Sequence, residues 1–373
     1  MEIRKVAKTR KSVTMWRIVK TKVLFGLFAL LPLSVWAQPE AMPMKLGPTP
    51  EGVVYFLPKT SLRFHLLVEK KTFTPGKYAK YAEKYMHLPD VQMEPQTTYN
   101  LAGLTISQAG IRDTSKCYSV KLKGGKCETA EVKLSDDGIL LAVNAEPLAG
   151  KPRPRFQPAP QAAEPDIRRY IPSEILSAGS TAKQAELTAQ LIYELQERRL
   201  QFITGEADDM PQDEQQLRLM IEETDRQRDM LMTLFTGNVR RDTTEYAVSL
   251  CPDGEVNRQV VFRLSQQRGL VDADDLSGIP FYMTIEDSNR TNMQKYALPD
   301  NKKEGGFYVN VPGYIRLTLY REDSLLSIFH LPMAQFGFVE LRGGQLFRRY
   351  QTHMRLNPVT GAVDYLHADT DEK

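Results

Sequence analysis

The chain has 373 residues, 42% hydrophobic and 25% charged, and this composition excludes an intrinsically disordered protein. Its formal net charge of +3 is misleading, because residues 1–37 contain eight basic residues and one acidic residue. The remaining residues comprise 41 basic and 45 acidic ones. A mildly acidic chain has no bulk electrostatic attraction for nucleic acid, so we expect no nucleic-acid partner.

The N-terminus has the three parts of a secretory signal peptide. A basic stretch runs to Lys22, 14 apolar residues follow from Val23 to Trp36, and a small residue, Ala37, comes next. This pattern predicts a signal peptide over residues 1–37 that is cleaved between Ala37 and Gln38. The alternative is an uncleaved membrane anchor, but the apolar run is shorter than the roughly 20 residues that a span needs. We therefore expect an exported protein, in the periplasm or at the outer membrane, with no transmembrane span after signal removal.

Residues 48–145 are predicted to form an N-terminal β-rich module with one short helix. Apolar residues from Leu62 to Val68 alternate with polar ones, which is typical of a strand with one buried face. The Thr74-Pro75-Gly76 sequence ends this strand, and a short helix follows until Pro89. Further strands are expected between residues 97 and 143.

Residues 146–172 contain seven prolines, which indicates a proline-rich linker or an extended surface strap. Residues 173–237 carry apolar residues at helical spacing in two stretches, interrupted by Gly205 and Pro211. The short loop between the stretches predicts an antiparallel helical hairpin. In the second stretch Thr224 and Arg228 fall on the apolar stripe, so we expect that stripe to be partly exposed or to pack elsewhere.

Residues 238–373 are predicted to form a C-terminal β-rich module, because alternating strands recur there between turn sequences such as Asn357-Pro-Val-Thr-Gly361. The predicted fold class is therefore α+β, with two antiparallel β-rich modules and a central antiparallel helical hairpin.

The three cysteines are Cys117, Cys127 and Cys251. A hairpin that turns at Gly124-Gly125 would place Cys117 opposite residues near Val132, too far to bridge Cys127. We expect no disulfide between these two residues. A disulfide between Cys251 and either of them remains an open alternative.

The sequence shows no motif for catalysis or for metal binding. None of the five histidines is spaced with another histidine, a cysteine or a carboxylate as in a zinc site. The acidic pairs Asp136-Asp137, Asp208-Asp209 and Asp274-Asp275 border turns, where aspartate is favoured for local backbone bonding. We predict no enzyme, no cofactor and no metal site.

Tyr78, Tyr81 and Tyr85 lie on one side of the short helix and are the candidate ligand contacts. An exposed row of tyrosines could stack on sugars. A row at helical spacing is more often the packed face of the helix, with its hydroxyl groups at the rim, and we favour packing.

Several motifs resemble an uncharacterised, exported family of Bacteroidota known as domain of unknown function 4831. They are Thr74–Tyr85, Arg199-Leu-x-x-x-Thr-Gly205, Leu234-Phe-Thr-Gly237, Gly269–Gly278, Ala334-Gln-Phe-Gly337 and the Asn357–Gly361 turn. The resemblance implies an exported protein with two β-rich parts around a helical segment, and it implies no activity, ligand or catalytic residue.

The favoured function is that of a non-catalytic binding or scaffold protein of the cell envelope, for a partner protein or a glycan. The alternative is a hydrolase of cell-wall or host polysaccharide, with two carboxylates in one cleft. A purely structural spacer is a third hypothesis.

Overall fold

A computed structural model describes the chain over residues 41–43, 52–120, 131–150, 153–154, 156–158, 166–208, 210–211, 213–288, 306–342, 347 and 350–369. The predicted signal peptide, its cleavage point at Ala37 and Gln38, and Cys127 lie outside these residues, so the expectations about them stay predictions.

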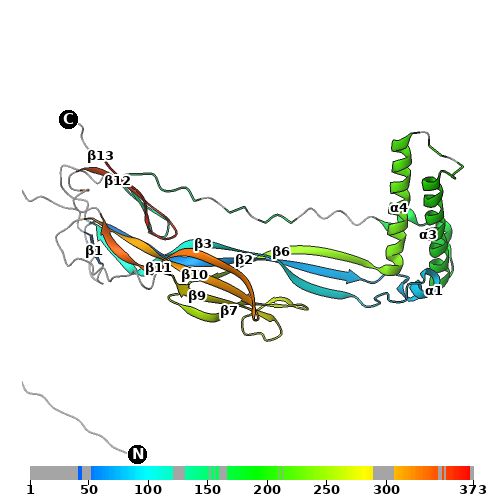
Figure 1. Cartoon of the computed structure of the whole chain (residues 1–373), viewed down its shortest axis with the longest axis horizontal. Helices are drawn as coiled ribbons and strands as arrows, with labels where there is room; N and C mark the ends of the chain where they lie inside the picture. The colour runs from blue at the N-terminus through cyan, green and yellow to red at the C-terminus, as the bar shows by residue number, and fades with distance from the viewer. Residues whose placement is uncertain are drawn as a thin grey trace, which may run out of the picture. The chain divides into compact units, whose positions relative to one another are not determined.

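The first sheet is antiparallel and has the strand order β1-β3-β2-β6 (Figure 1). Its strands are β1 (Ala41–Pro43), β2 (Val53–Thr74), β3 (Gln96–Val120) and β6 (Asn238–Leu250). The alternation predicted from Leu62 to Val68 is confirmed, because Leu62, Phe64, Leu66 and Val68 are all buried on one face of β2.

The second sheet is also antiparallel, with the order β11-β10-β9-β7-β8. Its strands are β7 (Val256–Ser265), β8 (Gly269–Val271), β9 (Ile279–Asp287), β10 (Phe307–Arg321) and β11 (Ser324–Arg342). The buried face of β2 packs against this sheet, and the shared core includes Phe64, Phe281, Met283, Leu317 and Met333.

The third sheet has the order β13-β12-β5-β4. Its strands are β4 (Val132–Leu134), β5 (Leu140–Val143), β12 (Gln351–Leu356) and β13 (Val363–Asp369). A second core forms here, where Tyr55 and Leu57 at the start of β2 pack with Leu140, Phe307 and Met354.

The short helix of the N-terminal segment consists of a 3-10 turn, η1 (Ala79–Tyr81), and α1 (Ala82–Met86). After the proline-rich segment come η2 (Ile167–Tyr170), α2 (Ser173–Ser177), α3 (Thr181–Thr204) and α4 (Glu214–Thr236). Ser180 caps the N-terminus of α3. The helix ends at Gly205, as the sequence predicts, and this glycine has the left-handed conformation.

The helices form a third core with the tyrosine segment. Its buried members are Tyr78, Ala82, Met86, Ala185, Ala189, Ile192, Leu195, Leu231, Leu234 and Phe235. One ion pair also joins the two long helices, since an oxygen of Asp225 on α4 lies 2.7 Å from Arg199 Nε on α3. The same oxygen lies 2.9 Å from Nη1 of Arg228, which is also on α4. Thr224 is buried and donates its hydroxyl to Met220 O at 2.7 Å, so the polar residues of this stripe are accommodated within the interface.

The α+β class, the antiparallel sheets and the helical hairpin are confirmed. The segments 48–145 and 238–373 do not form separate sheets, however. Strand β2 pairs with β6 along thirteen positions from Leu62 to Thr74, and β5 pairs with β12. The described residues accordingly belong to one compact unit. Among the described helices, none combines the length and the apolar character needed to cross a lipid bilayer.

Candidate functional site

Two glycines allow the end of β2 and the end of α4 to meet closely. A Cβ atom at Gly76 would lie 2.3 Å from Leu234 O, and the Tyr78 N–H donates to that same carbonyl at 2.7 Å. Gly237 has a φ of +84°, and a Cβ atom there would lie 2.5 Å from Thr74 O and 2.7 Å from the ring of Phe73. The ring of Phe73 therefore rests directly on the backbone of Gly237.

The tyrosine row mainly holds the helical core together. Tyr78 is 1% exposed, and its ring centre lies 5.5 Å from that of Phe235. Tyr81 and Tyr85 are half-buried against the same core, with ring centres 6.1 Å apart. The packing interpretation thus describes Tyr78, and a ligand could reach the row only at the outer faces of Tyr81 and Tyr85.

A cleft lies beside this junction of sheet and helix. Its cavity of about 420 Å³ is lined by Phe73, Leu88, Pro89, Asp90, Val91, Gln92 and Thr236. A second hollow of about 220 Å³ shares Phe73 and Gln92 with it and adds Lys71, Gln96, Thr98 and Val239. We call the two hollows together the junction cleft. Its larger part is a shallow, open hollow with a mostly apolar lining, which could contact one face of a ligand.

The polar groups of the junction cleft are oriented but not saturated. Gln92 Nε2 donates to Glu94 O at 3.0 Å and to Gln96 Oε1 at 3.1 Å. Gln92 and Gln96 are both exposed, and within the described part of the chain Gln92 Oε1 and Gln96 Nε2 have no protein partner, so they are open to water or to a ligand. Lys71 and Asp90 make no ion pair with a described residue. One acceptor and one donor therefore belong to two linked glutamines that line the same hollow as Phe73.

A serine, a histidine and a glutamate from three neighbouring strands form a second polar group, on the outer face of the first sheet. His65 Nε2 on β2 lies 2.7 Å from Ser107 Oγ on β3. His65 Nδ1 lies 3.3 Å from a carboxylate oxygen of Glu245 on β6. A nucleophile, a base and a carboxylate in this order resemble the arrangement of a hydrolase triad.

This serine–histidine–glutamate group lacks other parts of a catalytic site. Ser107 lies within a strand, whose backbone N–H groups point along the sheet and not above it, so the strand offers no donors for an oxyanion. Glu245 already binds the proline-rich segment, through Arg153 Nη1 at 2.6 Å and the Phe156 N–H at 3.3 Å. Desolvation, and then the charge of Arg153, lower the pKa of His65 despite the nearby carboxylate. We interpret the group as the anchor of this segment on the sheet.

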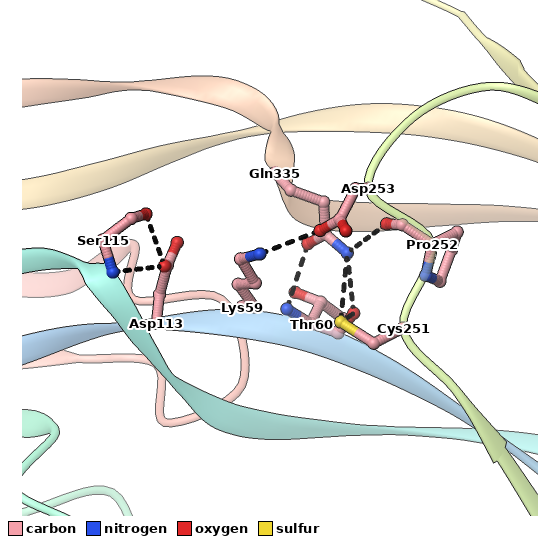
Figure 2. Close-up of polar contacts among 8 residues, drawn as sticks. All are labelled: Lys59, Thr60, Asp113, Ser115, Cys251, Pro252, Asp253 and Gln335. Atoms are coloured by element: carbon pink, nitrogen blue, oxygen red, sulfur yellow. Dashed lines mark hydrogen bonds and ion pairs between the residues drawn. The ribbon is translucent and has the colours of Figure 1, made fainter. Parts of the chain in front are cut away.

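A third polar group joins the first and second sheets at Thr60 (Figure 2). The Thr60 N–H donates to Gln335 Oε1 at 3.0 Å, while Gln335 Nε2 donates to Thr60 O and to Pro252 O, each at 2.9 Å. Cys251, a free thiol, points its sulfur toward Thr60 O at 3.8 Å, and burial raises the pKa of this thiol. Lys59 and Asp253 form an ion pair of 2.8 Å at the rim, where Asp253 is mostly exposed.

Two motifs of the family resemblance lie at or near this connection between the sheets. Gln335 belongs to Ala334-Gln-Phe-Gly337. The Asn357–Gly361 turn is linked to Pro58, close to Thr60, through the side chain of Asn310. Asn310 is 1% exposed, and its amide donates to Pro58 O and to Thr360 O, each at 2.9 Å. These side chains use their hydrogen bonds on the backbone, which is a structural role.

Acidic residues do not gather into a metal or hydrolase site in the part of the chain that the structure describes. No cluster of histidine, cysteine, aspartate or glutamate there could hold a metal ion. Asp275 lies in a turn, as expected, where it accepts the Ser277 N–H at 2.9 Å and pairs with Arg268. Asp90 is the one carboxylate that lines the junction cleft, whereas a glycoside hydrolase needs two.

Sequence reasoning did not single out the residues that line the junction cleft. Phe73 falls at the end of a predicted strand, and Gln92 and Gln96 follow the proline that ends the helix. The one available signal is the polar stretch after Pro89, which carries two glutamines close together. Ser107, His65 and Glu245 were also missed as a group, because each belongs to a different strand.

A family model described as a domain of unknown function (DUF4831) matches residues 51–364, and the chain belongs to this family. No curated protein and no solved structure matches the chain.

Proposed function

We propose that this member of the DUF4831 family is a non-catalytic binding protein of the cell envelope, and that its junction cleft binds a glycan. The observation that carries the proposal is the pair of exposed amide groups, Gln92 Oε1 and Gln96 Nε2, which have no partner among the described residues and line the same hollow as Phe73. Export rests on the N-terminal sequence pattern of residues 1–37.

Sugars present hydroxyl groups around their edge and C–H groups on their faces. An amide oxygen accepts from one hydroxyl and an amide N–H donates to the next, while the electron-rich face of an aromatic ring favours the C–H groups. The junction cleft supplies all three partners from Phe73, Gln92 and Gln96. Leu88, Pro89 and Val91 add apolar surface for a sugar face, while Lys71, Asp90 and two threonines add further partners for hydroxyl groups.

The non-catalytic part of the proposal is supported by the roles of several polar side chains, which hydrogen-bond one structural element to another. Gln335, Asn310 and Arg199 all join one element to another. The serine–histidine–glutamate group is engaged by the proline-rich segment through Arg153.

The test is calorimetric titration of the mature chain with three soluble hexasaccharides, built from N-acetylglucosamine, β-1,3-linked glucose and xylose. We expect at least one to bind with a millimolar or lower dissociation constant. The Gln92→Leu variant should weaken that binding about tenfold, because it removes an acceptor and releases Gln96. Gln196→Leu is the matched control on an exposed face of α3, and it should bind like the unmodified chain.

Two results would overturn the proposal. One is the absence of binding by all three hexasaccharides at millimolar concentration. The other is binding that Gln92→Leu leaves unchanged, which would place the sugar elsewhere on the molecule.

A further inference from the structure

Strand β3 has one edge that no described strand pairs along most of its length. On one side β3 pairs with β2 from Gln96 to Val120, with two interruptions. On the other side β1 pairs only with Tyr118, Ser119 and Val120 within the described part of the chain. Register is regular from Gly103 to Arg112, between one irregularity near Leu101 and another after Arg112. Along this stretch the outer edge of β3 has a row of backbone N–H and C=O groups that no described strand pairs, and a further strand could hydrogen-bond to them.

The open stretch of β3 carries no charge. From Gln96 to Ile111 the sequence contains no aspartate, glutamate, lysine or arginine. The opposite edge of the same sheet, β6, carries Arg240, Arg241, Asp242 and Glu245. Natural sheets discourage edge-to-edge pairing with charged residues, and this sheet applies that protection to β6 but not to β3.

We propose that Gly103–Ile111 of β3 pairs antiparallel with the same segment of a second copy of this chain, across a two-fold axis. The partner must be an extended strand, because only a strand satisfies alternating backbone donors and acceptors. The partner strand should also be uncharged, because this stretch of β3 offers no charged side chain with which a partner's charge could pair. The segment itself meets both conditions, since antiparallel self-pairing places no like charges opposite each other.

The side chains of the segment suit such an interface. Thr105, Ser107 and Ala109 are small and lie on the outer face, while Leu104 and Ile106 pack on the inner face against the core of the first two sheets. Paired copies would continue the first sheet across the axis, and the Arg153 side chain, whose Nη2 donates to Thr105 Oγ1 at 2.9 Å, would lie over the outer face of the paired strands. The junction cleft is lined by none of these residues, so this dimer and the glycan proposal fail or hold independently.

The first experiment needs no variant. The mature chain is examined by sedimentation velocity over a dilution series, and hydrogen exchange is measured at the highest and lowest concentrations. We expect a reversible dimer, with alternate amides between Gly103 and Ile111 exchanging more slowly at high concentration. A chain that stays monomeric over the whole series overturns the proposal, and so does a dimer that leaves these amides unprotected.

A matched pair of substitutions then tests the edge itself. Ser107→Lys places two lysines directly opposite each other on the two-fold axis and should raise the dimer dissociation constant about tenfold. Ser249→Lys makes the same change on the opposite edge, β6, and should leave dimerisation unchanged. Thermal unfolding of both variants shows that they are folded. Equal effects of the two lysines would refute the assignment to β3.

Discussion

Replacing Gln335 with leucine should destabilise the protein much more than the same replacement at Gln108. The Gln335 amide makes three hydrogen bonds to backbone groups of Thr60 and Pro252, at 2.9 to 3.0 Å (Figure 2). Leucine has nearly the same volume but no polar atom. The change therefore removes the hydrogen bonds and leaves the space filled.

The size of the effect follows from which groups lose their partners. Each hydrogen bond contributes about 0.5–1.5 kcal/mol net, and a buried donor left without a partner costs about 1–3 kcal/mol. Thr60 is 0% exposed, so water cannot reach its backbone N–H to replace the lost hydrogen bond. We expect a loss of about 3–5 kcal/mol in the free energy of unfolding, which is a large part of the roughly 5–15 kcal/mol typical of a folded protein.

The assay is equilibrium unfolding in urea, with Gln108→Leu as the control that makes the same substitution where less is lost. Gln108→Leu removes one hydrogen bond, from Gln108 Nε2 to Pro332 O at 2.7 Å. It should cost about 1 kcal/mol. If Gln335→Leu costs no more than Gln108→Leu, the three bonds do not hold the sheets together and the reasoning is refuted.

Two further changes test the junction and the third sheet. Gly237→Ala should cost about 3 kcal/mol or more in unfolding free energy, because it combines a positive φ with steric overlap. Gly205→Ala has the positive φ but open space around it and should cost about 1 kcal/mol, so equal losses would contradict the overlap. The Asn144 carbonyl and the Asp369 carboxylate raise the pKa of His353, so its stabilising effect is present below the ordinary pKa of 6.5 and is lost as pH rises through the raised value. The stability difference between the unmodified chain and His353→Gln should therefore shrink from mildly acidic to mildly alkaline pH, and a constant difference in urea unfolding would contradict this account.

Local sequence patterns predicted the elements of this fold well. The alternation from Leu62 to Val68, the stop at Gly205 and the turn at Asn357–Gly361 each depend on neighbouring residues, and each is found in the structure. What the patterns could not predict is the pairing partner. Strand β6 joins β2 because their apolar faces and their register match in space, and neither property can be read from the spacing of residues along the chain.

The candidate site was harder to predict for the same reason. Tyr78 stands out in the sequence because tyrosines recur at helical spacing, yet its burial depends on Phe235 of a helix much later in the chain. Phe73 and Thr236 line one cleft because two glycines let β2 and α4 approach, and a glycine's role in close packing is not visible without its neighbour. Likewise His65 acquires Ser107 and Glu245 only after three strands align.

Strand β2 also has a consequence for how the chain is made. Its residues enter the second core through Tyr55 and the first through Phe64, and these cores are completed by residues as late as Met333 and Met354. Contacts so distant along the chain make folding slow, because long loops must close before any of them form. Because synthesis proceeds from the N-terminus, the apolar face of β2 stays exposed to solvent until nearly the whole polypeptide has left the ribosome. An apolar segment exposed for this long is prone to aggregate before the residues that cover it have been made.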